Sequence, residues 1–416
     1  MAKKKAVKSK KLSKSKIVAK KVSKVVKKAS LKKVNSKSKK ASKSVKHISH
    51  KSNSHSSKPA KALSSMDAVR KKVFDFLELK DTKRIAIIAD NDQDGLTSAV
   101  QMKKFLSSKK VESQVFFYDH YTRNFSFPKE IFIKFNAEKT IFLDLNENFI
   151  SEILIQFGKF TGPFLVIDHH QGEVIRNNSF RCTVVKPKNF SSVEPSKYPV
   201  TKMVYDIFGG VDWVCSIGVI GDFAFEQWRD FLSQTEKKHS LSFAKLKTLD
   251  DIVACVTSQY PEKINSLFNF ISNAKSPNDL LSSEYIALKK LFDQKLEHLR
   301  QKFYQNADCY EDAQVCFFNA DTRFSGKLSN ILSAENKNKL IIVLEQPGSL
   351  VKCSIRRHDY AVNCSEVAKA GVAGTNQGNG GGHIPAAGAS FPPHYLDEFK
   401  KRVRMYLLQN PPKIVE

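Results

Sequence analysis

Three aspartates at alternate positions, Asp90, Asp92 and Asp94, follow directly after the apolar run 85–89. That run predicts a buried strand, and Gly95 opens a helix-forming stretch behind it. No Lys or Arg lies among the aspartates, and carboxylates this close repel each other unless a cation joins them. A hard divalent metal ion is the cation that oxygen ligands favour. The alternative is a helix N-terminus carrying acids, which are favourable there without any metal.

Three further short apolar runs predict strands, and stretches able to form helices separate them. The four predicted strands are residues 85–89, 115–118, 140–144 and 164–168. Strand–helix alternation with apolar strands predicts an α/β fold with a parallel, doubly wound sheet. Ligands of such sheets gather at the carboxyl ends of the strands. Three of the four strands end in Asp, so these acids are expected at one edge of the sheet.

The polar residues at that edge form one candidate set. Its members are Asp90, Asp92, Asp94, Asp144, Asp168, His169, His170 and Asp222, the last within an apolar helix expected over residues 211–232. An isolated His is usually a core or surface residue, whereas an Asp-His-His triplet directly after a strand rarely arises by chance. Ligation dominated by carboxylates favours Mn²⁺ or Mg²⁺ over Zn²⁺. Two such ions roughly 3.5–4 Å apart can hold an attacking hydroxide and stabilise a leaving oxygen.

Residues 245–304 have a helical pattern, and a second α/β unit starts near Gln314. Its strands are expected at 315–318, 340–343 and 350–355, and its helices at 327–333 and 397–408. The glycine-rich stretch 378–388 is expected to be a loop whose N–H groups converge on an anion, with a plain flexible turn as the alternative. Arg356 and Arg357 at a strand end strengthen the anion interpretation, because guanidinium matches phosphate bidentately.

The motifs resemble a known family. The ordered set Asp-Asn-Asp-Gln-Asp-Gly, Phe-Leu-Asp144, Ile-Asp168-His169-His170 and Gly-Asp222 resembles the four motifs of the DHH phosphoesterases. The loop Gly380–His383 with Ala386-Ala387-Gly388 resembles the signature of the DHH-associated DHHA1 domain. The resemblance covers residues from about 66 to 412 and is strongest to RecJ-like single-strand exonucleases of the compact archaeal type. These share the loop Asp-x-Asp-Gly-x-Thr-Ser, here Asp92 to Ser98.

The resemblance implies two divalent ions, Mn²⁺ or Mg²⁺, and a role for each motif residue. Asp92 and Asp94 would each hold one ion, Asp144 would bridge both, and His169 and Asp222 would ligate one each. Asp90 stands where relatives carry a metal-binding His or an Asp. His170 would touch the scissile phosphate, and Asp168 would orient the histidines. The residues expected to grip a phosphate or terminal nucleotide are Arg356, Arg357, Gly380, Gly381, Gly382 and His383.

The net charge of +28 is unevenly distributed over the 416 residues. Residues 1–60 hold 22 Lys and no Arg, Asp or Glu, which leaves only +6 for the remainder. A segment so polar and charged is expected to be disordered. It is interpreted as an arm that binds nucleic-acid phosphates without reading sequence, with a solubilising or targeting tail as the alternative. The sequence is thus predicted to have four segments: a basic tail at 1–62, a DHH catalytic domain at 63–235, a helical connector at 236–305 and a DHHA1 substrate-binding domain at 306–416.

Cysteine spacing and hydropathy predict the compartment. The seven cysteines are scattered without a CxxC pair, which argues against a disulfide framework or a zinc knuckle and fits a reducing cytosol. No apolar run approaches the ~18–20 residues of a membrane span, and the N-terminus lacks the apolar core of a signal peptide. The expected location is therefore the cytoplasm, in association with the nucleoid.

Three functions remain open at this stage. The first is an exonuclease acting on the end of single-stranded DNA or RNA, with a role beside replication or repair proteins. The second is a phosphodiesterase for oligoribonucleotides or cyclic dinucleotides. The third is a non-catalytic scaffold subunit of the replication helicase. The intact ligand set favours the first two functions over the third, and the basic tail favours the first, because a dinucleotide gains little from so long an arm.

Overall fold

The computed structural model describes residues 65–119, 122, 124–125, 127–157, 162–170, 182–321 and 323–413, which all belong to one compact unit. The predictions for the basic tail concern residues that lie outside this range. The first described helix, α2 (Met66–Leu77), begins directly after Ser65, which caps it: the Ser65 hydroxyl accepts a hydrogen bond from the N–H of Ala68 at 3.1 Å.

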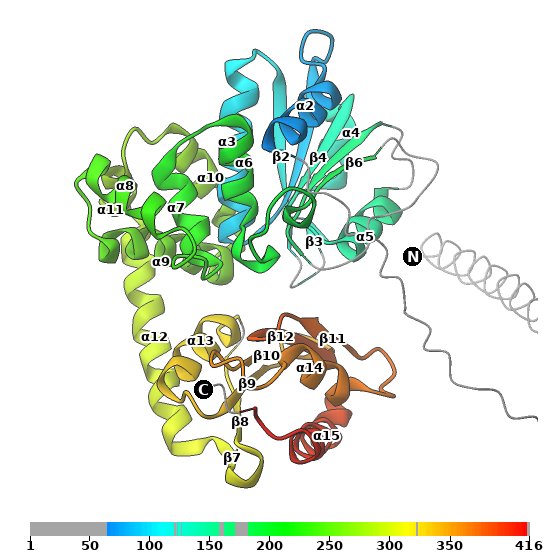
Figure 1. Cartoon of the computed structure of the whole chain (residues 1–416), viewed down its shortest axis with the longest axis vertical. Helices are drawn as coiled ribbons and strands as arrows, with labels where there is room; N and C mark the ends of the chain where they lie inside the picture. Colours follow the sequence, from blue (N-terminus) through cyan, green and yellow to red (C-terminus); the bar gives the residue numbers. More distant parts are fainter. Residues whose placement is uncertain are drawn as a thin grey trace, which may run out of the picture. The chain divides into compact units, whose positions relative to one another are not determined.

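The first sheet, sheet A, is parallel except for one edge strand, and its strand order is β3-β2-β1-β4-β5-β6 (Figure 1). Its strands are β1 (Arg84–Asp90), β2 (Glu112–Asp119), β3 (Asn124–Phe125), β4 (Lys139–Leu143), β5 (Phe164–Ile167) and β6 (Cys182–Val185). The four predicted strands are all present, whereas β3 and β6 were not predicted. Helices cover both faces, so the predicted doubly wound α/β fold is confirmed.

Alternate residues of β1 pack on opposite faces, as a strand buried on both sides requires. Ile85 and Ile87 face the larger core, which is formed with α2, α3, α6, α7 and α9. Ala86 and Ile88 face a smaller core, formed with α4 and α5. The helices are α3 (Gln93–Ser108), α4 (Lys129–Phe135), α5 (Glu147–Phe157), α6 (Val200–Phe208), α7 (Asp212–Gly221) and α9 (Phe243–Gln259).

The prediction of one continuous helix over residues 211–232 is wrong. The chain instead forms α7, ends it at Asp222, and starts α8 (Arg229–His239) after a turn. Phe223 has a φ of +54°, which is outside the α-helical region and breaks the helix at this point. Asp222 therefore lies at a helix end rather than in the middle of a buried helix. The helical pattern then continues as predicted in α9, α10 (Ile264–Asn273), α11 (Pro277–Leu281) and α12 (Tyr285–Asn306).

A second sheet, sheet B, follows α12 and has the order β11-β12-β10-β9-β8-β7, with only β8 and β9 parallel. Its strands are β7 (Asp308–Tyr310), β8 (Val315–Asn319), β9 (Leu340–Glu345), β10 (Val351–Arg356), β11 (Asn379–Gly382) and β12 (Ala386–Phe391). Its main helices are α13 (Ser325–Glu335), α14 (Cys364–Val372) and α15 (Leu396–Gln409). The second predicted α/β unit is thus present. The bounds of the four predicted segments stay a prediction.

The argument from cysteine spacing against disulfide bonds is wrong for one pair of cysteines. Cys309 in β7 and Cys316 in β8 are direct partners in the antiparallel register, their Cα atoms are 4.1 Å apart, and their sulfurs form a disulfide. The spacing of seven residues does not reveal this, because only the hairpin register brings the two residues face to face. Cys182, Cys215, Cys255, Cys353 and Cys364 are free thiols.

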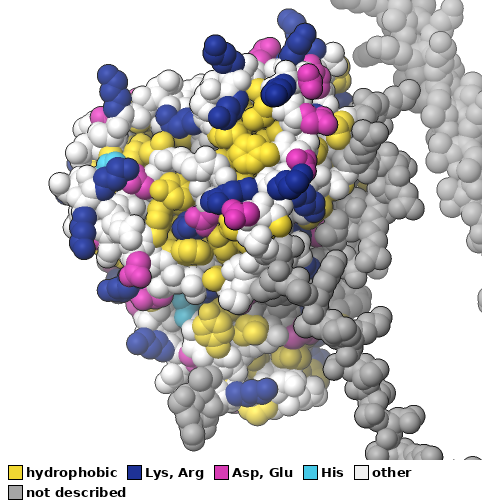
Figure 2. All heavy atoms as spheres, turned by 45° about the horizontal axis from the view of Figure 1, so that its top comes forward, with side chains coloured by type: hydrophobic (Ala, Val, Ile, Leu, Met, Phe, Trp, Pro, Cys, Tyr) yellow, Lys and Arg dark blue, Asp and Glu magenta, His cyan; other side chains and the backbone are white. Residues whose placement is uncertain are grey.

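Two surface properties follow from the described part of the chain. On the face shown in Figure 2, Lys and Arg side chains are scattered between apolar and acidic ones rather than gathered into one patch. This agrees with the small share of the net charge that lies outside residues 1–60. Among the helices of the described ranges, none combines the length and the apolar character that a membrane crossing needs.

Candidate metal centre

The candidate site lies at the point in sheet A where the order of the strands reverses. β1 is the first strand in the chain and pairs with β2 on one side and β4 on the other, so their connecting helices lie on opposite faces of the sheet. A crevice forms at the carboxyl ends of strands at such a switch point. Asp90 is the last residue of β1, and Asp144 directly follows β4. The predicted gathering of acids at this edge therefore occurs.

The loop after β1 turns tightly into α3. Asp92 caps the helix, because its Oδ1 accepts a hydrogen bond from the N–H of Gly95 at 2.9 Å. A Cβ atom on Gly95 would lie 2.3 Å from the carbonyl oxygen of Asp90. Only glycine allows the helix to start this close to the strand end, which keeps Asp90, Asp92 and Asp94 together.

The backbone at Asp144 adopts an uncommon conformation. Its φ is +59°, in the left-handed region that Asp and Asn tolerate better than other residues with side chains. Its side chain is 2% exposed, so the carboxylate is held in the crevice by the backbone on one side and by packing on the other. Such local strain concentrates at functional sites.

Seven of the eight candidate residues meet in overlapping groups. Three groups have ligand atoms within 4.8 Å of one another: Asp90, Asp92 and Asp144; Asp94, His169 and Asp222; Asp144, His169 and His170. Asp144 and His169 each belong to two groups, so the groups form one continuous cluster. Asp90, Asp94, Asp144 and His169 are buried, and Asp92, His170 and Asp222 are half-buried. Asp168 is the candidate outside these groups.

Asp94 serves the fold as well as the cluster. Its two oxygens accept hydrogen bonds from the N–H groups of Val200 at 2.6 Å and Thr201 at 2.7 Å, at the start of α6. A carboxylate has about four lone-pair sites, so these two bonds leave room for a metal ion. Burial, then the neighbouring carboxylates of Asp222 and Asp92, raise the pKa of Asp94 well above its usual value.

His169 points its Nε2 at the carboxylates. This atom lies 3.4 Å from Oδ1 of Asp144 and 3.5 Å from Oδ2 of Asp222. Its Nδ1 lies 3.2 Å from the carbonyl oxygen of Pro195, which fixes the proton on Nδ1 and leaves the Nε2 lone pair for a cation. Burial lowers the pKa of His169 to about 3, so the ring is neutral, as a metal ligand must be.

His170 is held by Asp168. The Nδ1–H of His170 donates to Oδ1 of Asp168 at 2.7 Å. Burial alone would lower the pKa of His170, but Asp168 raises it to about 9; burial would raise the pKa of Asp168, but His170 and Lys186 lower it to about 2. The predicted orienting role of Asp168 therefore has a geometric basis for His170, whereas His169 contacts Pro195 instead.

The cluster lacks the positive charge that its acids require. Oδ1 of Asp144 and Oδ2 of Asp222 are buried and have no hydrogen-bond partner within the described residues. Burial, together with neighbouring carboxylates, raises the pKa of both residues well above the usual range. Orphaned buried oxygens of this kind are costly unless a cation coordinates them. The residues present thus fit oxygen-preferring divalent ions such as Mn²⁺ or Mg²⁺.

Addition of Mn²⁺ is therefore expected to stabilise the folded protein. At a concentration about 100 times the dissociation constant, an ion that binds only the folded state adds about 2.7 kcal/mol, or roughly 5–10 °C in Tm for a domain of this size. Differential scanning fluorimetry with and without EDTA would measure the shift. The shift should be larger at pH 8 than at pH 6, because protons compete for the same oxygens. An equal shift in an Asp144→Asn variant would contradict a metal site here.

The α/β unit built on sheet A is the first lobe, and the unit built on sheet B is the second lobe. The second lobe forms one wall of a cleft next to the loop after β1. A cleft of about 360 Å³ is lined by Asn91, Asp92 and Gln93, which follow β1 of sheet A, and by Ser354 and Arg356 of β10 in sheet B. Ion pairs of Arg323 and Lys327 join the lobes beside it. Arg323 contacts Asp119 at 2.5 Å, and Lys327 contacts Asp251 at 2.6 Å. Substrate in this cleft would touch both lobes at once.

Arg356 and Arg357 point in different directions, as neighbouring residues of an extended chain do. Arg356 lines the cleft, where Asn330 accepts from its Nε at 2.9 Å. Arg357 is 3% exposed, and its guanidinium donates to Asp359 and Gln314. Nε and Nη1 of Arg357 are thus engaged within the protein, and its predicted contact with substrate stays a prediction.

The glycine-rich stretch is not the loop that the sequence predicts. Residues 379–382 form strand β11, whose peptide groups alternate in direction instead of converging on an anion. Gly380 permits close packing, since a Cβ there would lie 2.6 Å from the carbonyl oxygen of Ala368, and Gly382 has a φ of +146°. A Cβ on Gly381 would meet nothing within 4 Å. Contacts of these glycines with substrate stay a prediction.

His383 begins the turn between β11 and β12. Its Nδ1 is buried without a hydrogen-bond partner among the residues described. Burial, followed by the charge of His170, lowers the pKa of His383, so this side chain of the second lobe lies close to the metal-site histidines. Its predicted contact with substrate is compatible with this location.

The sequence interpretation missed Lys186, a cation at the same edge. Lys186 follows β6, is 3% exposed, and contacts both Asp168 and Glu147. The available signal was a β-branched run, Thr183-Val184-Val185, with a charged residue directly after it, as at the ends of β1, β4 and β5.

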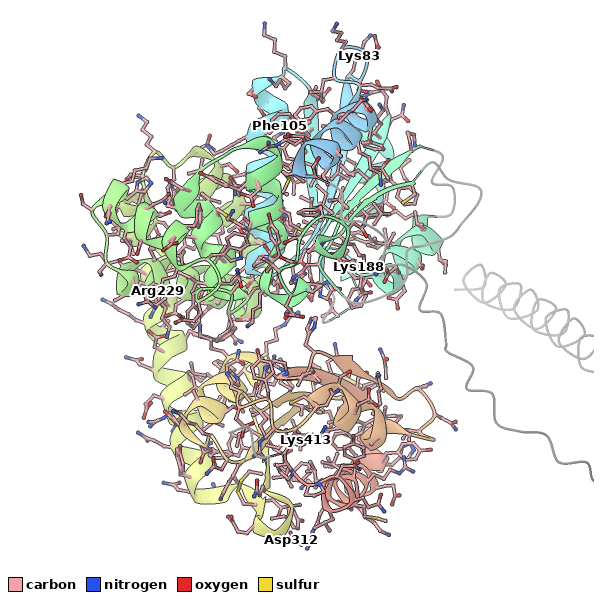
Figure 3. All side chains as sticks on the ribbon, viewed as in Figure 1. Lys83, Phe105, Lys188, Arg229, Asp312 and Lys413 are labelled. Carbon is pink, nitrogen blue, oxygen red and sulfur yellow. A yellow bond between two sulfur atoms is a disulfide. The ribbon has the colours of Figure 1, made fainter. Side chains whose placement is uncertain are left out.

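Comparisons with known proteins agree with this architecture. Residues 312–409, which begin at Asp312 (labelled in Figure 3), match the DHHA1 domain family. RecJ from Thermus thermophilus in complex with Mn²⁺ is 16% identical, with a TM-score of 0.61 over 86% of this chain and 57% of that chain. This chain therefore spans little more than half the length of that protein. No curated protein matches the chain.

Two further structures match over nearly their full length. An exonuclease RecJ bound to manganese is 16% identical, with a TM-score of 0.55 over 86% of this chain and 97% of that chain. The DHH domain of a member of a ribosomal protein family is 13% identical, with a TM-score of 0.55 over 83% and 90%. A DHHA1 domain thus lies near the carboxyl end of the chain, and the chain has the fold of these RecJ structures over most of its length.

Proposed function

We propose that this protein is a metal-dependent phosphodiesterase that hydrolyses single-stranded nucleic acid from an end. The observation that carries the proposal is the cluster of five aspartates and two histidines, with unpartnered buried oxygens on Asp144 and Asp222 among the described residues. One member of the cluster, Asp92, lines a cleft whose opposite wall holds Arg356. An acidic centre that needs cations, facing a fixed guanidinium, suits a phosphodiester drawn between the two lobes.

The ligand roles follow from the grouping. Asp90, Asp92, Asp94, Asp144, His169 and Asp222 would hold two Mn²⁺ or Mg²⁺ ions, with Asp144 shared between them because it belongs to two groups. When bound, such ions supply a hydroxide near neutral pH and stabilise a leaving oxygen. Hydrogen bonds from the start of α6 would keep Asp94 in place, and the contact with the carbonyl oxygen of Pro195 would keep His169 in place.

His170 would act directly on the substrate. Asp168 keeps its ring doubly protonated at neutral pH, with Nδ1–H committed to the carboxylate. The Nε2–H then remains as a donor for a non-bridging phosphate oxygen of the scissile group, where negative charge grows in the transition state. His170 is a third exposed, unlike the buried His169, so a substrate can reach its ring.

Arg356 is proposed to bind a phosphate next to the scissile one. Its Nε donates to Asn330, and its Nη1 donates to the carbonyl oxygens of Ile355 and Ala387. These bonds fix the guanidinium plane, and in the described part of the chain they leave Nη2 for a ligand. Because the contact holds the ground state and the transition state alike, it should act on KM more than on kcat.

Replacing Arg356 by Gln is accordingly expected to raise KM roughly 10–100-fold while kcat changes little, as loss of a charge-assisted hydrogen bond predicts. Steady-state kinetics on an end-labelled oligonucleotide with Mn²⁺ would measure both constants. Lys352→Gln is the matched control, because Lys352 points to the same side of β10 and lies outside the cleft lining. An unchanged KM in the Arg356 variant would argue against phosphate binding at this residue.

The direct test of the function is hydrolysis of single strands carrying a label at the 5′ or the 3′ end, as DNA and as RNA, with Mn²⁺ or EDTA. Release of mononucleotides from one end, only with the metal, is the expected result. Fragments of mixed lengths that arise by internal cleavage, or no product from any strand, would contradict the proposal.

A phosphodiesterase for dinucleotides is the second candidate. The cleft of about 360 Å³ lies near the lower end of the range for small-molecule sites, which suits a substrate of two nucleotides. Rates on a dinucleotide and on a 20-nucleotide strand separate the two functions. An exonuclease should process the long strand at least as efficiently, whereas a dinucleotide enzyme should lose activity as the strand lengthens.

A further inference from the structure

Lys186 is a buried cation directly behind the catalytic edge. It follows β6, and its side chain is 3% exposed. Lys188, two residues further along the same turn and labelled in Figure 3, is exposed instead. A buried ammonium group is costly unless its donors are satisfied, so its location calls for partners that offset the cost.

The ammonium group of Lys186 has three such partners. Its Nζ donates to Oε1 of Glu147 at 3.0 Å and to the backbone carbonyl oxygen of His170 at 2.9 Å. It also forms an ion pair with Oδ2 of Asp168 at 3.0 Å. Three oxygen atoms therefore lie around the ammonium group, two as hydrogen-bond acceptors and one as an ion-pair partner. Two of the three partners belong to the Asp168–His170 pair, and Glu147, at the start of α5, balances the charge.

We propose that Lys186 is a positioning residue that holds His170 in its working orientation through two points, the main-chain carbonyl of His170 and the carboxylate of Asp168. This inference rests on the proposed function of His170 as a donor to phosphate. One point fixes the backbone from which the imidazole starts, and the other fixes the carboxylate that sets the ring rotation. The pair of constraints leaves the Nε2 edge of the ring aimed in one direction.

The contacts of Lys186 bear on the orientation of His170 and not on the binding of metal. Lys186 belongs to none of the three metal-ligand groups. The oxygen of Asp168 that it contacts is Oδ2, whereas the imidazole uses Oδ1. Removing the ammonium would free Oδ2 of Asp168 from its ion pair, so the carboxylate could turn and release the ring. The ligands Asp144, His169 and Asp222 would keep their contacts.

The test uses Lys186→Met, which keeps the length and removes the charge, with Lys188→Met as the matched control. We expect kcat to fall about 10–100-fold in the Lys186 variant, the usual cost of losing a partner that orients an active-site side chain. We expect KM and the Mn²⁺ affinity, measured by isothermal titration calorimetry, to stay within about twofold, because binding contacts are kept. Lys186→Arg, which retains a cation, should recover part of kcat.

A second measurement is independent of activity. In metal-free protein labelled with ¹⁵N-histidine, the hydrogen-bonded Nδ1 proton of His170 should give a protected downfield NMR signal, assigned by its loss in His170→Gln. The signal should be lost or rapidly exchanging in Lys186→Met and retained in Lys188→Met. If Lys186→Met proves unfolded, the same two readouts are made on Lys186→Arg against Glu147→Gln.

The outcomes separate the inference from the proposed function. Wild-type protein that hydrolyses no strand with Mn²⁺ overturns the proposed function, and the NMR signal still decides whether Lys186 orients His170. Wild-type activity with an unchanged kcat and an unchanged proton signal in Lys186→Met overturns the positioning role alone. Loss of Mn²⁺ affinity in a folded Lys186→Met variant also overturns it, because the residue would then support the metal ligands.

Discussion

Replacing Asp144 by Asn is expected to lower kcat/KM for single-strand hydrolysis on the order of 10³-fold. Asp144 is shared by two ligand groups, so its loss should cost more than the 10–100-fold typical of an outer partner of a metal site. Asn is the informative replacement, because it also tolerates the left-handed backbone that residue 144 adopts. The fold is therefore kept while the ligand charge is removed. Initial rates at saturating Mn²⁺ would measure the effect.

Asp230→Asn is the control for this variant, since Asp230 is an exposed residue in the first turn of α8 and contacts none of the ligand groups. Its activity should equal that of the wild type. Circular dichroism should show the same helix and strand content in both variants. Activity of Asp144→Asn within tenfold of the wild type would leave the proposed two-ion role of Asp144 without support.

Deleting residues 1–60 is expected to remove most of the salt-sensitive affinity for long strands. The deleted segment carries 22 Lys and no acid. If about six of these lysines neutralise phosphates, the slope of log affinity against log salt is roughly −4, because single strands give about −0.7 per phosphate. Affinity of the whole chain should then fall by about 10²–10³-fold between 50 and 200 mM salt. Fluorescence anisotropy with a labelled 30-nucleotide strand would record both slopes.

The same deletion should leave the catalytic site intact. Hydrolysis of a dinucleotide, which is too short to gain from a distant arm, is the control and should proceed at the same rate with and without residues 1–60. An identical salt slope in the two proteins would show that the tail does not bind nucleic acid, and would favour the alternative of a solubilising or targeting segment.

The sequence identified the candidate metal site at the edge of sheet A because the relevant signals are local. Short apolar runs ending in Asp90, Asp144 and Asp168 predict parallel strands, and parallel strands place their carboxyl ends at one edge. The residue order therefore implies proximity without any knowledge of side-chain packing. Ser65 is a local signal of the same kind, because serine favours the position before a helix, and it caps α2 in the structure.

Other features depend on contacts between distant parts of the chain. The disulfide between Cys309 and Cys316 requires the register of a hairpin, and the strand character of residues 379–382 requires β12 beside them. The separation of Arg356 from Arg357 depends on which side of sheet B faces the cleft, a property that no local pattern contains. The end of α7 at Asp222 results from a backbone break at a position whose residues would permit a helix.

By itself, then, the sequence determined which residue types could meet at the edge of sheet A, because strand direction and alternation are encoded locally. Only the tertiary structure decided how they meet. Asp144 is shared between groups, Asp94 is tied to α6, and His170 is held by Asp168 with Lys186 behind it. The physical reason is that burial and neighbouring charge set the protonation and orientation of each side chain, and both depend on elements far apart in the chain.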